Sequence, residues 1–273
     1  MISSTGNSRV KRIVQLREKS RERIRENVFL AEGIKMFEEA PAEHIKEIYI
    51  EEKLTEALTF QPLLDKLKMC RMRDIPIETV TEEVFRKISD TVSPQGILCV
   101  MERFSYDGEK IVQNALEKRE KSGLPPLFLL LEDIQDPGNL GTMIRTAEGA
   151  GADGIFMSKG TVDIYNPKTI RATMGSLYRM PFLYMENLEE GIRLLQKYDI
   201  TVYAAHLKGK KFFHEINYSG GSGFLIGNEG SGLREKTADA ADCYLRIPME
   251  GKLESLNAAI AAALLMYQSR ISQ

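Results

Sequence analysis

The sequence predicts an α/β protein with two domains, and three observations lead to that prediction. Strand-like and helix-like stretches alternate along most of the 273 residues, which is typical of α/β folds. The continuous apolar run Leu127–Leu131 is typical of a strand buried on both faces of a parallel sheet. A charged helix expected at Lys110–Lys121, followed by the chain break Ser122-Gly123-Leu124-Pro125-Pro126, separates two series of this alternation. We therefore expect a small α/β domain at 1–105, a linker at 106–124 and a second α/β domain with a mostly parallel sheet at 125–273.

Composition narrows the class of protein. Hydrophobic residues make up 43% and charged residues 28%, as in a globular protein, and the net charge of −2 excludes a polycation. No run of eighteen apolar residues and no signal peptide is visible, so we expect a cytoplasmic protein without a membrane partner. Cys70, Cys99 and Cys243 are far apart, and the three histidines are scattered, so we expect neither a disulfide framework nor a metal site.

The first thirty residues are locally basic and predict one amphipathic helix. Its apolar stripe would consist of Val10, Ile13, Val14 and Leu16, with Ile24 later. The opposite face would carry cations suited to RNA phosphates, with these candidates: Arg9, Lys11, Arg12 and Arg17. The alternative, a solvated helix face without a partner, remains open at this point.

The rest of the first domain alternates short strands and helices. We expect strands at Phe29–Gly33, Ile45–Ile50, Ile77–Val80 and Gly96–Met101. We expect helices at Ile34–Ala40, Phe60–Met72 and Thr81–Ser89. Thr81 is a good cap for the last helix, since acidic residues follow it in the first turn.

The second domain repeats the alternation with more apolar strands. After Leu127–Leu131 we expect strands at Gly154–Ser158, Phe182–Tyr184, Ile200–Ala205, Gly223–Gly227 and Tyr244–Ile247. Helices are expected to begin near Asn139 and to span Asn166–Ala172, Leu188–Tyr198 and Leu256–Arg270.

Two polar loops follow strands of this domain, at the sheet edge where open α/β sheets bind ligands. In the first loop, Asn139 would cap the helix, and Arg145 would lie early in it, where the helix dipole disfavours a cation. An anionic ligand or a carboxylate partner would explain that cation. The second loop, Asn228–Leu233, is rich in glycine but lacks the lysine of a P-loop, so by itself it indicates ligand binding only weakly.

The stretch Ile247–Ala259 predicts a third polar loop. Pro248 ends the strand and Gly251 permits a bend, after which Ser255 or Asn257 could cap a helix rich in alanine. Because small side chains allow close packing, these polar residues would lie at the mouth of a tight site. The alternative is an ordinary loop and a capped core helix.

Taken together, three stretches resemble the motifs of the SpoU (TrmH-type) RNA methyltransferases of the SPOUT superfamily. They are Asn139–Arg145, Phe224–Leu233 and Ile247–Ala259. Residues 1–105 resemble the family's substrate-binding domain more loosely, at Arg9-Val10-Lys11, Phe29–Gly33 and Ser93-Pro94-Gln95-Gly96. One small departure is Ala258-Ala259, where the third motif usually has a β-branched residue.

The resemblance implies a deep trefoil knot in the C-terminal domain, with the tail 247–270 threaded through a loop. It implies S-adenosylmethionine as methyl donor and S-adenosylhomocysteine as product. The positions that match the family's cofactor contacts are Gly227, Ile247 and Leu256, with Met249 and Ala205 completing the pocket. It also implies a homodimer, with the site at the subunit interface.

The implied reaction is transfer of a methyl group from a sulfonium to a ribose 2′-hydroxyl of RNA, without a metal. Arg145 matches the family's catalytic arginine. Because an arginine side chain keeps its proton until about pH 12, we favour phosphate anchoring over proton abstraction. Four further positions would orient this arginine, the ribose and the cofactor: Asn139, Glu229, Ser255 and Asn257. Glu229 is also a candidate carboxylate partner of Arg145.

Ribosomal RNA is the expected substrate, because a folded N-terminal domain is more similar to the ribosomal branch of the family than to its transfer RNA enzymes. Three alternatives stay open. They are a transfer RNA methyltransferase, a non-catalytic RNA-binding factor for ribosome assembly, and an unrelated nucleotide-binding α/β enzyme. The intact motif residues argue against the last two.

Overall fold

The structure, a computed structural model, describes residues 1–57 and 61–272 and divides into two compact units. Unit 1 comprises Met1–Phe104 and Asp163–Tyr178, and unit 2 comprises Ser105–Val162 and Arg179–Gln273. The segment Asp163–Tyr178 thus belongs with the N-terminal residues, although the sequence places it in the range 125–273. The ranges 1–105, 106–124 and 125–273 were predicted as two domains and a linker, and this division stays a prediction.

Unit 1 contains a four-stranded mixed sheet in the order β1-β4-β2-β3. Its strands are β1 (Val28–Glu32), β2 (Ile45–Glu51), β3 (Ile77–Val80) and β4 (Ile97–Glu102). β4 is antiparallel to both β1 and β2, whereas β2 and β3 are parallel. Its helices are α1 (Ser8–Glu18), α2 (Ser20–Glu26), α3 (Ile34–Glu39), α4 (Glu52–Ala57), α5 (Gln61–Met72), α6 (Glu82–Ile88) and α9 (Pro167–Thr173). Phe60, the expected start of α5, lies outside the described residues.

The basic N-terminal stretch forms two helices, so the prediction of one continuous helix is wrong. Lys19 is extended, with φ −123°, and separates α1 from α2. Val10, Ile13 and Leu16 of the expected stripe are buried, whereas Val14 is partly buried. Ile24 on α2 is 60% exposed and does not continue the stripe. The break places Arg23 in the interior, where its guanidinium donates to the carbonyl of Leu16 at 2.8 Å and to the carboxylate of Asp163 at 2.6 Å.

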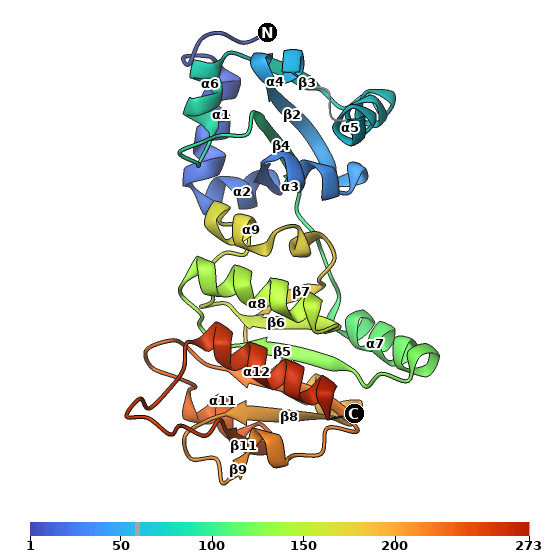
Figure 1. Cartoon of the computed structure of the whole chain (residues 1–273), viewed down its shortest axis with the longest axis vertical. Coiled ribbons are helices and arrows are strands. Elements are labelled where there is room, and N and C mark those ends of the chain that lie inside the picture. The colour runs from blue at the N-terminus through green and yellow to red at the C-terminus, as the bar shows by residue number, and fades with distance from the viewer. Residues whose placement is uncertain (58–60, 273) are drawn as a thin grey trace. The chain divides into compact units, whose positions relative to one another are not determined.

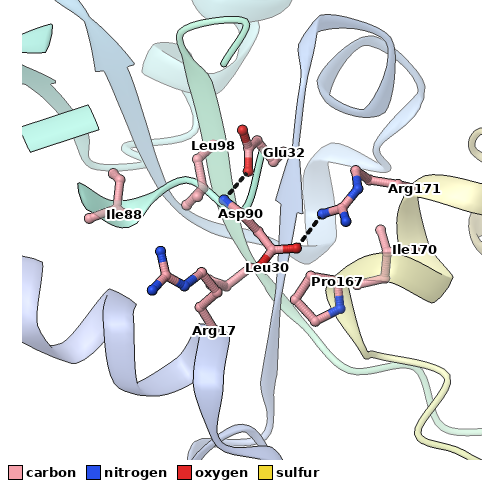
Figure 2. Close-up of a pocket in the computed structure, with 9 residues that line it drawn as sticks. All are labelled: Arg17, Leu30, Glu32, Ile88, Asp90, Leu98, Pro167, Ile170 and Arg171. Atoms are coloured by element: carbon pink, nitrogen blue, oxygen red, sulfur yellow. Dashed lines mark hydrogen bonds and ion pairs between the residues drawn. The ribbon is translucent and has the colours of Figure 1, made fainter. Parts of the chain in front are cut away.

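α9 packs within unit 1 through polar contacts. Figure 2 shows Arg171 of α9 bonded to the carboxylate of Asp90 at 2.5 Å, while the main-chain amide of Asp90 donates to Glu32 at 2.9 Å. The crevice that these residues line together with Arg17 has a volume of about 10 Å³. Since that is room for about one water molecule, the crevice is not a ligand site.

Unit 2 contains a seven-stranded sheet in the order β7-β6-β5-β10-β8-β11-β9, and every neighbouring pair is parallel (Figure 1). Its strands are β5 (Leu127–Leu131), β6 (Gly154–Ser158), β7 (Phe182–Met185), β8 (Ile200–Ala205), β9 (Lys211–Phe212), β10 (Gly221–Ile226) and β11 (Cys243–Arg246). Its helices are α7 (Gly108–Ser122), α8 (Pro137–Gly149), α10 (Leu188–Lys197), α11 (Glu235–Asp239) and α12 (Ala258–Ile271). β5 and β10 are buried throughout, as parallel central strands require.

These strands confirm the predicted α/β class with a mostly parallel sheet in the second part of the chain. The trefoil knot stays a prediction. The range 106–124 contains α7, close to the charged helix expected at Lys110–Lys121, and Ile111, Val112 and Ala115 of α7 lie in the core of unit 2. In residues 1–57 and 61–272, no helix has the length and apolar character needed to cross a membrane.

Candidate active site

A cavity of about 340 Å³ lies in unit 2 where β8, β10 and β11 end. It is lined by all five residues expected to contact a cofactor: Ala205, Gly227, Ile247, Met249 and Leu256. Glu229 and Ser255 line it as well. Its volume falls in the range of small-molecule sites, roughly 300–1,000 Å³. The carboxyl ends of neighbouring parallel strands thus bring residues that are distant in sequence to one site.

The glycine-rich loop after β10 forms one wall of the cavity. Main-chain hydrogen bonds join Asn228 and Gly232 in both directions, at 3.1 and 3.0 Å. A Cβ atom on Gly227 would lie 2.4 Å from main-chain atoms of Gly232 and Leu233, so only glycine permits this closure. The Asn228 side chain accepts from the amides of Gly230 and Ser231 at 2.9 Å, which fixes the loop from inside.

A buried carboxylate holds the far end of this loop. Glu132, directly after β5, is 1% exposed. It accepts from the main-chain amide of Arg234 at 2.7 Å, from Arg234 Nε at 2.8 Å and from the Thr237 hydroxyl at 2.5 Å. Glu132 was not predicted as a site residue, although an acid directly after a fully buried strand is a visible signal.

A chain of side-chain hydrogen bonds joins the three motifs. Asn257 Nδ2 donates to Asn139 Oδ1 at 3.0 Å, and Asn139 Nδ2 donates to Glu229 Oε1 at 2.9 Å. We call these three residues the amide relay. Its ends are fixed too, because Asn257 Oδ1 accepts from Ala259 and Ile260 and thereby caps α12. Of the two cap candidates Ser255 and Asn257, the structure therefore selects Asn257.

Glu229 is held by neutral donors. Its carboxylate accepts from the main-chain amides of Gln135 at 3.0 Å and Asp136 at 3.2 Å, in addition to Asn139. Burial opposes ionisation of this group, but the hydrogen bonds outweigh burial and keep the pKa of Glu229 below its ordinary value. Glu229 is therefore a fixed anion at neutral pH.

α8 begins earlier than expected, which corrects two predictions. The side chain of Asp136 caps the helix by accepting from the amide of Asn139 at 2.8 Å, and Pro137 occupies the first turn. Asn139 is therefore not the cap, and its side chain is available to the amide relay. Arg145 is the ninth residue of α8, counted from Pro137, so the argument from an unfavourable helix dipole does not apply.

Arg145 is exposed and has no ion pair or hydrogen bond to another residue in the described part of the chain. The suggested pairing with Glu229 is wrong, because amides satisfy that carboxylate. Ser255 is also exposed, at the cavity wall. Asn139, Arg145 and Asn257 are not among the residues that line the cavity, although Asn139 and Asn257 are joined to Glu229 at its wall by the amide relay.

The expected RNA-binding cations of α1 are mostly engaged within unit 1. Arg9 pairs with Glu78, and Arg12 pairs with Glu26 at 2.7 Å and with Glu47 at 2.8 Å. Arg17 bonds to Glu18 and to the carbonyls of Lys87 and Ser89, at 2.9, 3.0 and 2.6 Å respectively. Lys11 is exposed and makes no such contact among the described residues. RNA binding by these residues stays a prediction.

No cluster of three His, Cys, Asp or Glu side chains that could hold a metal ion occurs within residues 1–57 and 61–272.

Comparison with known proteins assigns a family to most of the chain. The SpoU rRNA Methylase family matches residues 126–267, and the MRM3-like substrate binding domain matches residues 7–99. A 23S rRNA (guanosine(2553)-2′-O)-methyltransferase of Bacillus subtilis (strain 168) is 33% identical over 271 residues, covering 98% of each chain. A 23S rRNA (guanosine-2′-O-)-methyltransferase of Xylella fastidiosa (strain Temecula1 / ATCC 700964) is 28% identical, covering 85% of this chain and 90% of the other.

A solved structure agrees with the fold. The S-adenosylmethionine-bound rRNA methyltransferase from Sinorhizobium meliloti superposes with a TM-score of 0.83 at 30% identity. The superposition covers 99% of this chain and 97% of that chain.

Proposed function

The chain belongs to the SpoU rRNA methylase family, and from that premise we propose that it methylates a ribose 2′-hydroxyl of ribosomal RNA with S-adenosylmethionine as donor. The observation that supports this most directly is the cavity at the ends of β8, β10 and β11, which gathers residues of the second and third motifs. The amide relay then ties the first motif to them. The relatives from Bacillus and Xylella are both named as guanosine-specific enzymes of 23S rRNA, so we expect guanosine here.

The cavity residues fit the proposed cofactor. Ile247, Met249 and Leu256 offer apolar surface for a purine ring, and the loop after Gly227 offers main-chain groups for polar atoms. When bound, S-adenosylmethionine supplies an electrophilic methyl group on a sulfonium that is already a good leaving group. The protein therefore has to align the acceptor hydroxyl and assist loss of its proton.

Arg145 anchors the acceptor in this proposal. A guanidinium that is not consumed by a carboxylate is free to hold the phosphate next to the reacting ribose with two parallel hydrogen bonds. The amide relay keeps Asn139, Glu229 and Asn257 in fixed orientations around the acceptor, with Ser255 at the cavity wall. Preorganised polar groups of this kind do not have to reorient during the reaction.

A second copy of the chain is the proposed partner of α12. Four exposed apolar side chains recur along one side of this helix: Ile260, Leu264, Tyr267 and Ile271. The Tyr267 hydroxyl lies beside Gly149, on the exposed side of α8 that also carries Arg145. A homodimer formed through this stripe would enclose Arg145 at the interface. Analytical ultracentrifugation tests it, since Leu264→Glu should convert a dimer to monomers, whereas a monomeric wild type would overturn it.

Unit 1 is the proposed RNA-binding domain, as the match to a substrate-binding domain supports. Arg9, Lys11, Arg12 and Arg17 remain its proposed RNA contacts, and Lys11 is the one whose charge is not already compensated. An enzyme with this substrate and these contacts would work in the cytoplasm, where ribosomal RNA is modified.

The decisive experiment uses labelled S-adenosylmethionine and unmodified ribosomal RNA, with transfer RNA in a parallel reaction. A ribose 2′-O-methyl group blocks alkaline cleavage at its own linkage. Label in alkali-resistant dinucleotides that contain guanosine, from ribosomal RNA only, is the expected result. Label in mononucleotides would mean base methylation and would contradict the proposal.

Two further outcomes identify the alternatives. Resistant label from transfer RNA alone would make the protein a transfer RNA enzyme. No label from free RNA or from assembling ribosomal particles, together with no binding of the cofactor, would identify a non-catalytic RNA-binding protein.

A further inference from the structure

A basic and aromatic segment follows β8 and ends at the edge of the larger sheet. Residues 206–214 read His-Leu-Lys-Gly-Lys-Lys-Phe-Phe-His, and they include β9 at the end of the strand order (Figure 1). β9 pairs with β11 alone, with Leu245 opposite Lys211 and Arg246 opposite Phe212. A Cβ atom on Gly209 would lie 2.6 Å from the main chain of Leu245, so the segment lies directly against β11.

Three side chains of this edge are layered. The Arg246 guanidinium lies over the Phe212 ring, 4.6 Å from its centroid. The imidazole of His214 is parallel to that ring, with 5.7 Å between centroids and 5° between planes. Phe213 contacts the His214 ring edge-on, with 5.5 Å between centroids. Arg246 and His214 are exposed, so the group presents stacked side chains at the surface of the protein. Such surfaces bind the face of an unpaired base.

The layered group is also held firmly in place. The Phe212 amide donates to the Glu215 carboxylate at 2.8 Å, which closes the short turn Phe213–Glu215. The buried Tyr218 donates its hydroxyl hydrogen to the carbonyl of Phe213 at 2.7 Å. Because these bonds fix the turn before any ligand arrives, binding loses little conformational entropy.

Positive charge lies beside the group without compensation. Lys210, Lys211 and Arg246 are exposed and have no carboxylate partner in the residues that the structure describes, whereas Lys208 pairs with Glu235 at 3.0 Å. Glu215 accepts from the Phe212 amide and keeps its negative charge, so three exposed cations lie beside this one carboxylate of the turn. His206, Leu207 and Arg246 line the cavity of the active site, so this surface begins at the cavity rim.

We propose that Lys210, Lys211, Phe212, His214 and Arg246 form a binding surface for single-stranded substrate RNA beside the methylated nucleotide. We call it the edge surface. An unpaired flanking base stacks on the layered side chains, and the lysines bind the neighbouring phosphates. Bases within an A-form duplex are already stacked on each other, so this surface favours a loop or a bulge. The inference rests on the proposed function, which supplies the RNA.

The test compares two variants with a matched control. Lys210→Ala/Lys211→Ala removes the uncompensated charges, His214→Ala removes one stacking surface, and Lys208→Ala removes a lysine whose charge is compensated. We expect the KM for RNA to rise about five- to tenfold in the double variant and about fivefold or more in His214→Ala. The kcat at saturating RNA and the KM for S-adenosylmethionine should stay within twofold of wild type, and Lys208→Ala should resemble wild type throughout. His214→Tyr keeps a flat aromatic side chain at this position, so its KM for RNA should lie close to that of wild type.

Salt dependence and direct binding complete the test. Two lost phosphate contacts should reduce the slope of log affinity against log salt by about 1.4, at about 0.7 per contact for single strands. An unchanged KM for RNA and an unchanged slope, or an equal effect of Lys208→Ala, would overturn the edge surface. Fluorescence anisotropy with a labelled single-stranded rRNA fragment measures the same differences without turnover. A wild type that binds but never methylates would therefore refute the proposed function while still testing this surface.

Discussion

The carboxylates around Arg12 in unit 1 and the carboxylate of Glu229 in unit 2 are held in opposite ways. On α1 of unit 1, Arg12 is bonded to both Glu26 and Glu47, so its positive charge is compensated within the unit. At the active site of unit 2, Glu229 is held by Asn139 and main-chain amides, and Arg145 is left without an ionic partner. Because neutral donors satisfy Glu229, this acid does not consume a cation, and Arg145 keeps an uncompensated charge that can bind a phosphate. Availability of a cation therefore depends on which carboxylates the fold brings to it.

The largest expected effect comes from the free cation of unit 2. Arg145→Ala should lower kcat by about 10²–10³, as removal of one preorganised donor typically does, and Arg145→Lys should recover only part of it. Single-turnover methylation of ribosomal RNA measures this, with equilibrium binding of RNA and cofactor as controls. An Arg145→Ala protein that methylates at the wild-type rate while binding RNA normally would remove Arg145 from the mechanism.

The amide relay should give the next largest effect. Asn139→Ala leaves Glu229 and Asn257 without their shared partner, which corresponds to about 1–3 kcal/mol and thus a roughly 5- to 150-fold lower kcat. Because the residues act as one network, Asn139→Ala/Glu229→Gln should be little worse than the more damaging single change. Fully additive losses in this double-mutant cycle would show that the two side chains act independently.

A smaller effect should distinguish Lys11 from Arg12, the uncompensated and the ion-paired cation of α1. Lys11→Ala should weaken RNA binding about two- to threefold and lower the salt slope by about 0.7–1, since its charge is uncompensated. Arg12→Ala should instead lower the free energy of unfolding by up to about 1 kcal/mol, with a smaller change in RNA affinity. Urea unfolding and RNA titrations measure the two quantities, and equal RNA effects would contradict the distinction between compensated and uncompensated cations.

The smallest effect concerns pH. The lowered pKa of Glu229 means that its hydrogen bonds contribute stability above the unfolded-state value of about 4.3, and this contribution is lost as pH falls through the lower folded-state pKa. Wild type should therefore lose stability between neutral pH and about pH 3 more steeply than Glu229→Gln. Urea midpoints at several pH values test this, and parallel curves for the two proteins would contradict it.

Much of the fold could be predicted because local pattern and tertiary environment agree. The strands Leu127–Leu131, Gly154–Ser158 and Ile200–Ala205 were predicted with their observed bounds, since buried parallel strands are short apolar runs between turn residues. The break at Lys19 could not be predicted, because lysine is a good helix former and the Arg23–Asp163 contact that accompanies the break joins residues 140 positions apart. Pro137 did mark the start of α8, and it should have indicated Asp136 as the cap.

Part of the candidate site could be predicted from the sequence as well, and part could not. The residues at the cavity follow from family motifs and from the rule that ligands bind at the carboxyl ends of strands, as Ala205 and Ile247 illustrate. The hydrogen-bond partners of the charged side chains could not be predicted from the sequence. Arg9 and Arg12 bond to Glu78 and Glu47, which lie 69 and 35 residues away, and no local pattern encodes such pairs. The Glu132 contacts with Arg234 and Thr237 span more than a hundred residues and were missed for the same reason.

The amide relay makes methylation a reporter of the folded state. Its hydrogen bonds join positions that are 90 and 118 residues apart, so no locally structured fragment can assemble it. A denatured ensemble with residual helices or hairpins would retain spectroscopic signal yet lack the site. Enzymatic rate in rising denaturant should therefore follow the loss of tertiary structure and disappear no later than the circular dichroism of the helices, which gives refolding experiments a measure of native molecules alone.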